Sequence, residues 1–300
     1  MITTPVTFPS FAKINWFLRV LGKRPDGYHE VVTVLQTISL HDELTIQLSE
    51  NGPIRLTCDD PTIPTGPDNL ILKAVDRFQD SFGTEITLKK RIPAMGGLGG
   101  ASSNAAVTLL AINKLLKNAQ IEFEPGSLGA DVPFFLHGGR CAATGIGEVL
   151  RPLPDGPKQY LIVVTPNAKV STAKAYSLLK APSLTTSNPD SILSSSLADL
   201  NSADSRQWPL CNDFERVIFE IEPEIERAKN ALLEVGAWGA LLAGSGSSVF
   251  GVFDSEAERN RGLVNLNSEA GWRVFACETI SREEYVGAMN SSGFSLFTLS

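Results

Sequence analysis

Residues 93–106, PAMGGLGGASSNAA, constrain the fold more than any other part of this chain, because four of the five residues from Gly96 to Gly100 are glycine. Glycine loses more conformational entropy on folding than any other residue, so a cluster of it marks a place where the backbone bends sharply or is closely approached. An alanine-rich helical pattern follows, and a helix start presents unpaired N–H groups and the positive end of the helix dipole. The segment therefore predicts either a tight structural turn or a cradle for an anion, most often phosphate.

Two familiar phosphate-binding motifs do not fit this segment. The P-loop requires G-x-x-x-x-G-K-[ST], and no lysine occurs between Pro93 and Asn113. The dinucleotide fingerprint G-x-G-x-x-G would start at Gly97, but Ser102 stands where its third glycine belongs. If the segment binds phosphate, it does so in a fold of another kind.

The balance of charge and hydrophobicity argues against several classes of protein. A formal net charge of −7 does not suit a surface that holds nucleic acid, and no apolar run approaches the ~20 residues that span a bilayer. The first residues resemble neither a signal peptide nor a transit peptide. Because the four cysteines form no C-x-x-C pair, we expect free thiols in a cytoplasmic protein. From the charge and the lack of a long apolar run we expect no nucleic-acid or membrane partner.

The first half of the chain reads as strands followed by helices. Alternating apolar residues on both sides of the turn sequence RPDG predict a β-hairpin within the first forty residues. Helical spacing after the glycines predicts a helix that starts at Ser102. The remaining elements expected here are a helix over 68–83, capped by Asp68 and closed by Gly83, and strands at 42–48 and 85–92.

The second half repeats this order, which indicates an α+β fold rather than a doubly wound parallel sheet. A charged pattern over 214–235 predicts one helix, and GALLAGSGSSVFGVF, residues 239–253, predicts a strand broken by glycines. The Pro- and Gly-rich segment 152–159 marks the expected boundary between domains. We therefore predict an N-terminal domain over residues 1–155 and a C-terminal domain over residues 156–300.

Two charged residues each allow both a purely structural and a functional interpretation. Lys13 stands between aromatic residues in the first strand, either solvated at a sheet edge or directed into a cleft. Asp131 precedes Val132 and Pro133, where it either caps a short helix or serves a reaction. The residues alone do not decide between these roles.

Four segments together resemble the GHMP small-molecule kinases: SFAKINWFLRVLGKRPDGYHEV, PAMGGLGGASSNAA, LGADVPFFL and GSGSSVF. The resemblance extends roughly from Ser10 to Ile280. It implies a two-domain α+β kinase fold, with an N-terminal ribosomal-protein-S5-like domain, a C-terminal ferredoxin-like domain and the active site between them. One departure is Ala101, which replaces a common glycine and requires a negative φ.

The resemblance implies that the glycine segment wraps ATP and that Mg²⁺ accompanies the nucleotide. It does not imply which residues bind the Mg²⁺. Asp131 matches the catalytic aspartate that accepts the proton of the attacking hydroxyl, and Lys13 matches the catalytic lysine. Gly99 is where we expect the closest approach of backbone to phosphate. The ATP-binding residues so implied are Pro93, Ala94, Met95, Gly96, Gly97, Leu98, Gly99, Gly100, Ala101, Ser102 and Ser103.

The motifs AKIN, RPDGYHE and GADVPFF narrow the resemblance to a branch that phosphorylates the 2-hydroxyl of a cytidine diphosphate derivative of methylerythritol in isoprenoid biosynthesis. In that branch Tyr28 and His29 border the cytosine, Tyr176 stacks on it and Asn15 faces the erythritol part. The structural alternative for Tyr176 is that it packs in the core as an amphipathic aromatic residue and does not contact the base. The expected partner is thus a small molecule, and the expected assembly is a monomer or a homodimer.

Three other functions stay open at this point. The first alternative is a GHMP kinase that acts on homoserine, mevalonate or a sugar. That alternative would not explain the presence of Tyr28, His29 and Tyr176. The second alternative is a non-catalytic relative, against which the presence of both Lys13 and Asp131 argues. An RNA-binding protein with a related fold is disfavoured by the acidic balance of charge.

Overall fold

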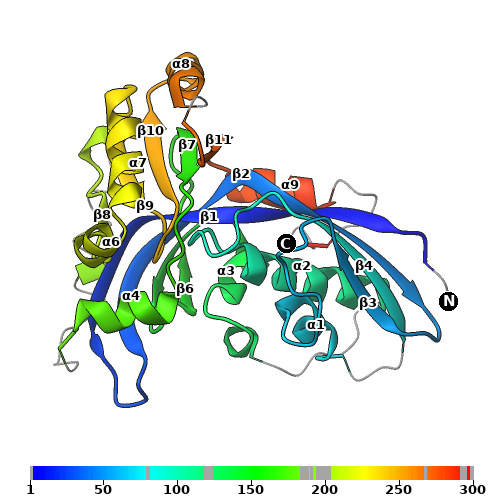
Figure 1. The fold of residues 1–300 in the computed structure, drawn as a ribbon. Helices are drawn as coiled ribbons and strands as arrows, with labels where there is room; N and C mark the ends of the chain where they lie inside the picture. Colours follow the sequence, from blue (N-terminus) through cyan, green and yellow to red (C-terminus); the bar gives the residue numbers. More distant parts are fainter. Residues whose placement is uncertain are drawn as a thin grey trace.

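The computed structural model describes residues 3–78, 82–117, 124–182, 189, 192–193, 204–266, 269–290 and 296–297. Within these residues the chain forms two β-sheets and the helices that cover them (Figure 1). No helix in this part of the chain is long and apolar enough to cross a membrane. The mixture of sheets and helices confirms the predicted α+β class.

The long hairpin predicted from the first forty residues is present. It consists of β1 (Val6–Lys23) and β2 (His29–Ser49), which pair antiparallel. The middle of the hairpin is buried on both faces, because Phe11 belongs to one apolar cluster and Ile14 to another. Polar side chains in this part of β1 are therefore held inside the molecule.

The first sheet has the strand order β3-β4-β2-β1-β8, and β5 joins it by pairing with β2 and β6. Helices α1, α2 and α3 lie along the hairpin and its neighbours (Figure 1). The bounds are β3 (Ile54–Cys58), α1 (Leu70–Val75), β4 (Gly83–Lys89), α2 (Gly100–Leu115), η1 (Pro125–Ser127), α3 (Val132–His137), β5 (Arg140–Thr144), β6 (Val149–Pro152) and β8 (Cys211–Asn212).

Three details of the expected helices are wrong. Asn69, not Asp68, caps α1 by accepting a hydrogen bond from the N–H of Ile71, and the Asp68 side chain is 99% exposed. Gly83 begins β4 instead of closing the helix, which ends at Val75. Helix α2 begins at Gly100 rather than Ser102.

The second sheet is antiparallel, with the strand order β11-β7-β10-β9. The predicted strand broken by glycines is the pair β9 and β10. The predicted helix over 214–235 is two helices, because Pro223 lacks the N–H that would continue α6, and Glu222 before it takes a non-helical conformation (φ −137°, ψ 74°). The bounds are β7 (Tyr160–Thr165), α4 (Thr172–Leu179), η2 (Ser205–Gln207), α6 (Glu215–Ile221), α7 (Pro223–Glu234), β9 (Gly239–Leu242), β10 (Val249–Phe253), α8 (Glu256–Leu266), β11 (Arg273–Glu278) and α9 (Arg282–Asn290).

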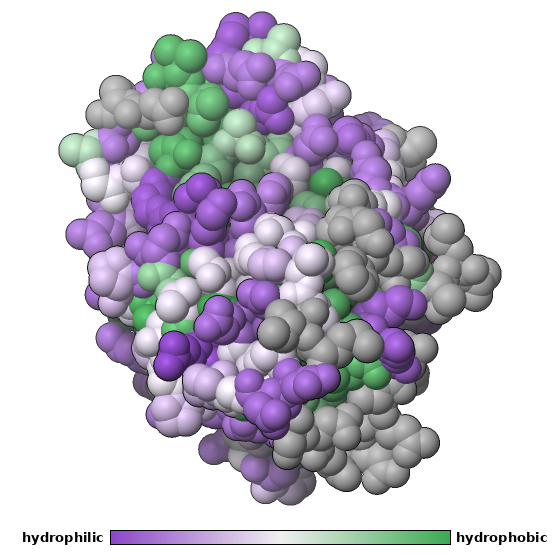
Figure 2. Space-filling view, turned by 90° about the vertical axis from the view of Figure 1, so that its right-hand side faces the viewer, coloured by the Kyte–Doolittle hydropathy of each residue, from purple (hydrophilic) through white to green (hydrophobic). Residues whose placement is uncertain are grey.

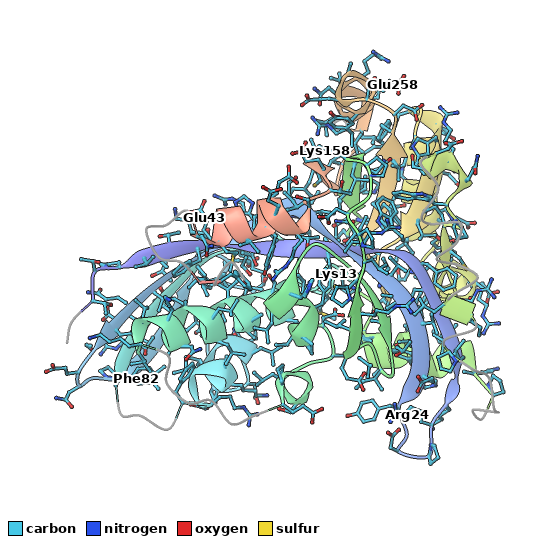
Figure 3. All side chains as sticks on the ribbon, turned by 180° about the vertical axis from the view of Figure 1, so that it is seen from behind. Lys13, Arg24, Glu43, Phe82, Lys158 and Glu258 are labelled. Carbon is cyan, nitrogen blue, oxygen red and sulfur yellow. The ribbon has the colours of Figure 1, made fainter. Side chains whose placement is uncertain are left out.

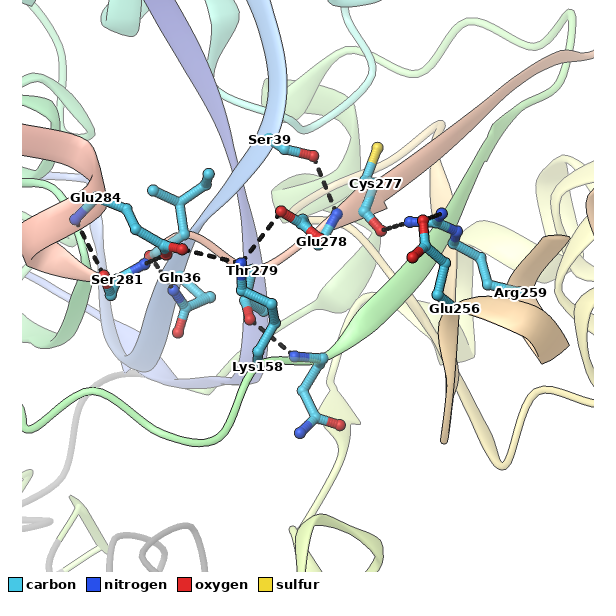
Figure 4. Close-up of polar contacts among 12 residues, drawn as sticks. Gln36, Ser39, Lys158, Glu256, Arg259, Cys277, Glu278, Thr279, Ser281 and Glu284 are labelled. Atoms are coloured by element: carbon cyan, nitrogen blue, oxygen red, sulfur yellow. Dashed lines mark hydrogen bonds and ion pairs between the residues drawn. The ribbon is translucent and has the colours of Figure 1, made fainter. Parts of the chain in front are cut away.

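Polar contacts join the two sheets where β2 meets β11 (Figure 4). The backbone N–H of Glu278 donates to Ser39 Oγ at 3.0 Å, and Gln36 Nε2 donates to the carbonyl of Ile280 at 2.9 Å. Lys158 forms ion pairs with Glu278 at 3.2 Å and with Glu284 at 2.9 Å. The junction is therefore fixed by hydrogen bonds as well as by apolar packing.

Late segments of the chain return to the first sheet. Strand β8 pairs in parallel with β1, and Tyr285 and Met289 of α9 pack into the core beside α2.

The domain boundary near Asp155 stays a prediction. Residues 118–123 and most of residues 183–205 lie outside the described residues. Hydrophilic residues predominate on the face shown in Figure 2.

Candidate active site

Lys13 lies in β1, an inner strand of the first sheet between β2 and β8. Its side chain is buried, and its Nζ donates to Asn15 Oδ1 at 3.0 Å. Its backbone N–H donates to the carbonyl of Leu98 at 3.0 Å, which ties β1 to the glycine loop (residues 93–99). A lysine at a sheet edge would be solvated, so that interpretation of Lys13 is wrong. Figure 3 shows it where the hairpin, the helices and the second sheet meet.

Asp131 occupies the N-cap position of α3, but its side chain makes no capping hydrogen bond. Its carboxylate lies instead 3.6 Å from Lys13 Nζ, and 30% of its side chain is exposed. The pair thus combines a buried cation with a carboxylate that a ligand can reach. Such a carboxylate can accept a proton, and such a cation can stabilise negative charge that develops nearby.

The glycine loop ends in the first turn of α2. Gly99 takes the N-cap position with φ +73° and no side chain caps the helix, so the N–H groups of the first turn lack intrahelical partners. Ala101 lies in this helix and is not among the non-glycine residues with positive φ, as its replacement of a glycine requires. Ser103 is buried and accepts a hydrogen bond from Ser10 Oγ at 2.8 Å, whereas Ser102 is partly exposed.

Two of the glycines serve contact between loops. A second glycine loop (residues 243–248) packs on the first, and its Ser247 and Ser248 N–H groups donate to Met95 and Gly96 carbonyls at 3.2 Å. A Cβ at Gly97 would lie 1.9 Å from the carbonyl oxygen of Ala243. The segment is therefore a close-packed turn at its start, and at its end it leaves backbone N–H groups without intrahelical partners.

Gly99, at the N-cap of α2, packs tightly against neighbouring side chains. A Cβ at Gly99 would meet the Phe135 ring at 2.8 Å and Lys13 Cγ at 3.1 Å. A larger residue there would strike the core and displace the catalytic lysine candidate. Gly99→Val is therefore expected to destabilise the fold even without a bound nucleotide.

The structure brings His29 and Tyr176 together. Their rings stack with centroids 4.7 Å apart, and Tyr176 also meets Phe214 edge-on at 4.9 Å. Burial and the positive charge of Lys23 lower the pKa of His29 below its usual value of 6.5. Burial, with a contribution from the charge of Asp131, raises the pKa of Tyr176 to about 12. Helix α4, which carries Tyr176, contacts the second glycine loop through Thr172 Oγ1 and Ser245 Oγ, 3.0 Å apart. That loop in turn lies beside Lys13, because a Cβ at Gly244 would be 3.3 Å from Lys13 Nζ.

The other two predicted substrate residues have different surroundings. Tyr28 is 60% exposed, next to His29 at the start of β2. Asn15 is buried and donates from Nδ2 to Thr33 Oγ1 at 2.8 Å, so its amide orientation is fixed from both sides by Thr33 and Lys13. A separate cleft of about 310 Å³, lined by Gln36, Asp155, Gly156, Lys158, Thr279, Ser281, Glu283 and Glu284, includes none of the predicted site residues.

Sequence reasoning missed Asn212, which holds the second glycine loop in place. Its Nδ2 donates to the carbonyls of Leu242 at 2.8 Å and Gly244 at 2.7 Å, and its Oδ1 accepts the N–H of Phe214 at 3.0 Å. The sequence signal that was available is an asparagine two residues before the start of a helical pattern, where its side chain can organise the helix entry. Asp42, discussed below, was missed as well.

Comparison with known proteins identifies the fold independently of this geometry. The family model "GHMP kinases N terminal domain" matches residues 69–139, and "GHMP kinases C terminal" matches residues 190–271. The crystal structure of a 4-(cytidine 5'-diphospho)-2C-methyl-D-erythritol kinase superposes with a TM-score of 0.72 at 32% identity, over 91% of this chain and 98% of that one. Homoserine kinase from Cytophaga hutchinsonii superposes with a TM-score of 0.65 at 18% identity, over 93% of this chain and 95% of that one, which shows a shared fold.

Curated relatives are more similar still. The 4-diphosphocytidyl-2-C-methyl-D-erythritol kinase of Citrifermentans bemidjiense is 40% identical over 277 residues, 90% of this chain and 97% of the relative. The enzyme of the same name from Syntrophotalea carbinolica is 39% identical over 283 residues, 92% of this chain and 99% of the relative. The chain therefore belongs to the GHMP kinases and, within them, to the family of 4-diphosphocytidyl-2-C-methyl-D-erythritol kinases.

Proposed function

We propose that this chain transfers the γ-phosphoryl group of ATP to the 2-hydroxyl of 4-diphosphocytidyl-2-C-methyl-D-erythritol, in the non-mevalonate pathway of isoprenoid biosynthesis. The observation that carries the proposal is the Lys13–Asp131 pair, 3.6 Å apart, beside a glycine loop that ends in an uncapped helix. The high identity to kinases named for this substrate supports the choice of acceptor.

The glycine loop fits a triphosphate. The uncapped first turn of α2 offers backbone N–H donors and the positive end of the helix dipole, and Ser102 adds a hydroxyl. No cluster of three or more His, Cys, Asp or Glu suited to a metal ion occurs in the described ranges. Asp131 is a carboxylate within this site that would be available to Mg²⁺, and the bound cation would neutralise charge on the phosphates.

The transfer then needs positioning more than covalent chemistry. Asp131 accepts the proton of the acceptor hydroxyl as its oxygen forms a bond to the γ-phosphorus, while the bond from that phosphorus to the β–γ bridging oxygen breaks and ADP leaves. Lys13, held by Asn15, keeps a positive charge beside the attacking oxygen and the transferred group. Asp131 returns its proton to solvent, to which it is open.

The aromatic residues suit the cytidine end of the acceptor. Because the pKa of Tyr176 is about 12, its phenol stays neutral and brings no negative charge near the diphosphate. Burial lowers the pKa of His29, which favours its neutral imidazole. The side chains of Tyr176 and His29 can both stack on a base or hydrogen-bond to it. Tyr28, exposed beside them, is free to close over the base. Asn15 would face the erythritol part.

The test is an ADP-release assay of the purified chain with ATP and Mg²⁺. Separate reactions contain 4-diphosphocytidyl-2-C-methyl-D-erythritol, homoserine, mevalonate or galactose, and Asp131→Asn serves as the inactive control. We expect turnover with the cytidine substrate alone. Equal or faster turnover with another acceptor would assign a different kinase activity, and binding of both substrates without ADP release would indicate a non-catalytic relative. A cytoplasmic location and a monomeric or dimeric state stay predictions.

A further inference from the structure

Asp42 is a fully buried carboxylate that accepts four hydrogen bonds. Its Oδ1 accepts the backbone N–H groups of Arg91 and Ile92 at 2.7 and 2.8 Å. Its Oδ2 accepts Lys90 Nζ at 2.7 Å and Asn104 Nδ2 at 3.1 Å. A carboxylate oxygen accepts two hydrogen bonds well, so the four donors satisfy this buried charge.

These donors come from both ends of the glycine loop. Arg91 and Ile92 lead directly into the loop, and Asn104 lies one turn inside α2, into which the loop runs. One side chain of β2 therefore fixes where the loop starts and where its helix begins. Holding both ends reduces the conformations that the loop can take before a ligand binds, which is the source of affinity by preorganisation.

Lys90 brings a buried positive charge close to the helix start. A Cβ at Gly100 would lie 3.2 Å from Lys90 Nζ, so the ammonium lies directly against the first residue of α2. A cation there opposes the helix dipole. The Asp42 carboxylate offsets this charge in an ion pair whose two side chains are 6% and 0% exposed. Removal of either partner alone would leave a buried charge unpaired.

A neighbouring residue makes a related but more limited contact. Ser10 pairs with Asp42 across β1 and β2, is equally buried, and donates to Ser103 Oγ of α2 at 2.8 Å. It holds the helix but not the entry of the loop. A comparison of the two residues therefore separates attachment of α2 to the sheet from fixation of the loop.

We propose that Asp42 is a positioning residue for ATP: through Arg91, Ile92, Lys90 and Asn104 it fixes both ends of the glycine loop in the arrangement that binds the triphosphate. The inference rests on the proposed function, because it assumes that the loop binds ATP. It goes beyond that function by assigning to Asp42, a residue of β2 with no exposed surface, control over affinity for one of the two substrates.

The test compares Asp42→Asn with the wild type and with Ser10→Ala. The asparagine can keep the bonds to Arg91 and Ile92 through its oxygen, but its amide group cannot accept from Lys90 and Asn104. Calorimetry with ATP and Mg²⁺ measures the Kd for ATP, and a second titration measures the Kd for the cytidine substrate. We expect the Kd for ATP to rise roughly ten- to a hundredfold, because the loop would lose part of its preorganisation for binding, and the other Kd to stay near the wild-type value.

The double variant Asp42→Asn/Lys90→Met guards against simple misfolding, because it removes both members of the buried ion pair. We expect it to regain much of the lost melting temperature while its Kd for ATP stays raised. Ser10→Ala should lower the melting temperature with little change in that Kd. A folded Asp42 variant with wild-type affinity for ATP, or equal losses for both substrates, would overturn the inference. Failure of the wild type itself to bind ATP would instead overturn the proposed function.

Discussion

The ammonium nitrogen of Lys13 lies 3.6 Å from a carboxylate oxygen of Asp131, and the two side chains differ sharply in exposure, at 5% and 30%. The buried lysine is fixed by Asn15, whereas the aspartate faces a region that a ligand can enter. This difference in exposure suits the two residues to different roles. Asp131 is suited to meet the acceptor hydroxyl, and Lys13 is suited to supply a charge that does not move.

Asp131→Asn is expected to leave the fold intact and to lower kcat by roughly 10²- to 10⁴-fold, the usual contribution of a positioned general base. The fold should survive because the side chain is partly exposed and does not cap α3. Steady-state kinetics and a melting curve on the same preparation check both parts. A variant with near-normal turnover would remove Asp131 from the mechanism.

Tyr176→Ala is expected to raise KM for the cytidine substrate and to leave KM for ATP nearly unchanged, because the ring meets His29 and Phe214 rather than the glycine loop. Tyr176→Phe is the matched control, since it keeps the ring and removes the hydroxyl. It should behave like the wild type if stacking is the main contribution. Equal increases in both KM values for Tyr176→Ala would show a general packing role.

His29 predicts a dependence of stability on pH. Its pKa in the folded protein is below the usual 6.5, so below that pH the unfolded chain binds more protons than the folded one. The free energy of unfolding should therefore fall as the pH drops from 6.5 toward the folded-state pKa. His29→Phe, which keeps a ring against Tyr176, should lose this part of the dependence.

Urea unfolding of the wild type and His29→Phe at several pH values between 7.5 and 5 measures the effect. The carboxylates titrate in both proteins and cancel in the difference. The difference in free energy of unfolding between the two proteins should change steadily across this interval. Parallel curves would mean that His29 has the same pKa in the folded and unfolded states.

Local patterns were sufficient for much of the fold. Alternation on both sides of RPDG specified β1 and β2, because period-two burial is a property of neighbouring residues. The helical pattern also continued across Pro223, so periodicity alone suggested one helix where the proline separates α6 from α7. The cap of α1 failed for a similar reason, since Asp68 and Asn69 are equally good capping residues by type.

The residues of the candidate site were harder to predict from the sequence than the fold. Family resemblance, not pattern, singled out Lys13 and Asp131, and their contact depends on how β1 and α3 meet in the core. Asp42 carries no local signal of its role, because Asn104, one of its partners, is distant in the chain. Asn212 has a local signal for its contact with Phe214, but none for its contact with Gly244. Nor could the glycine cluster reveal which of its members face another loop, as Gly97 does.

Gly97 offers the sharpest test of what the glycines do. Gly97→Ala would force a residue with φ +73° to carry a Cβ that lies 1.9 Å from the carbonyl oxygen of Ala243, so the two glycine loops must separate. The backbone atoms of this contact cannot move aside as a flexible side chain could. We expect a clear loss of stability together with weaker binding of ATP, because the glycine loop would be displaced.

Gly236→Ala is the control, because Gly236 also has positive φ (+102°) but its Cβ would meet nothing within 4 Å. It should lose only the conformational contribution, roughly 1–2 kcal/mol of the free energy of unfolding for a left-handed residue, and should bind ATP normally. Urea unfolding and calorimetry with ATP measure both quantities for each variant. If Gly97→Ala matched Gly236→Ala in stability and in Kd, contact between the loops would contribute nothing to the site. If Gly97→Ala lost stability but kept its affinity for ATP, the loops would support the fold without shaping the cradle.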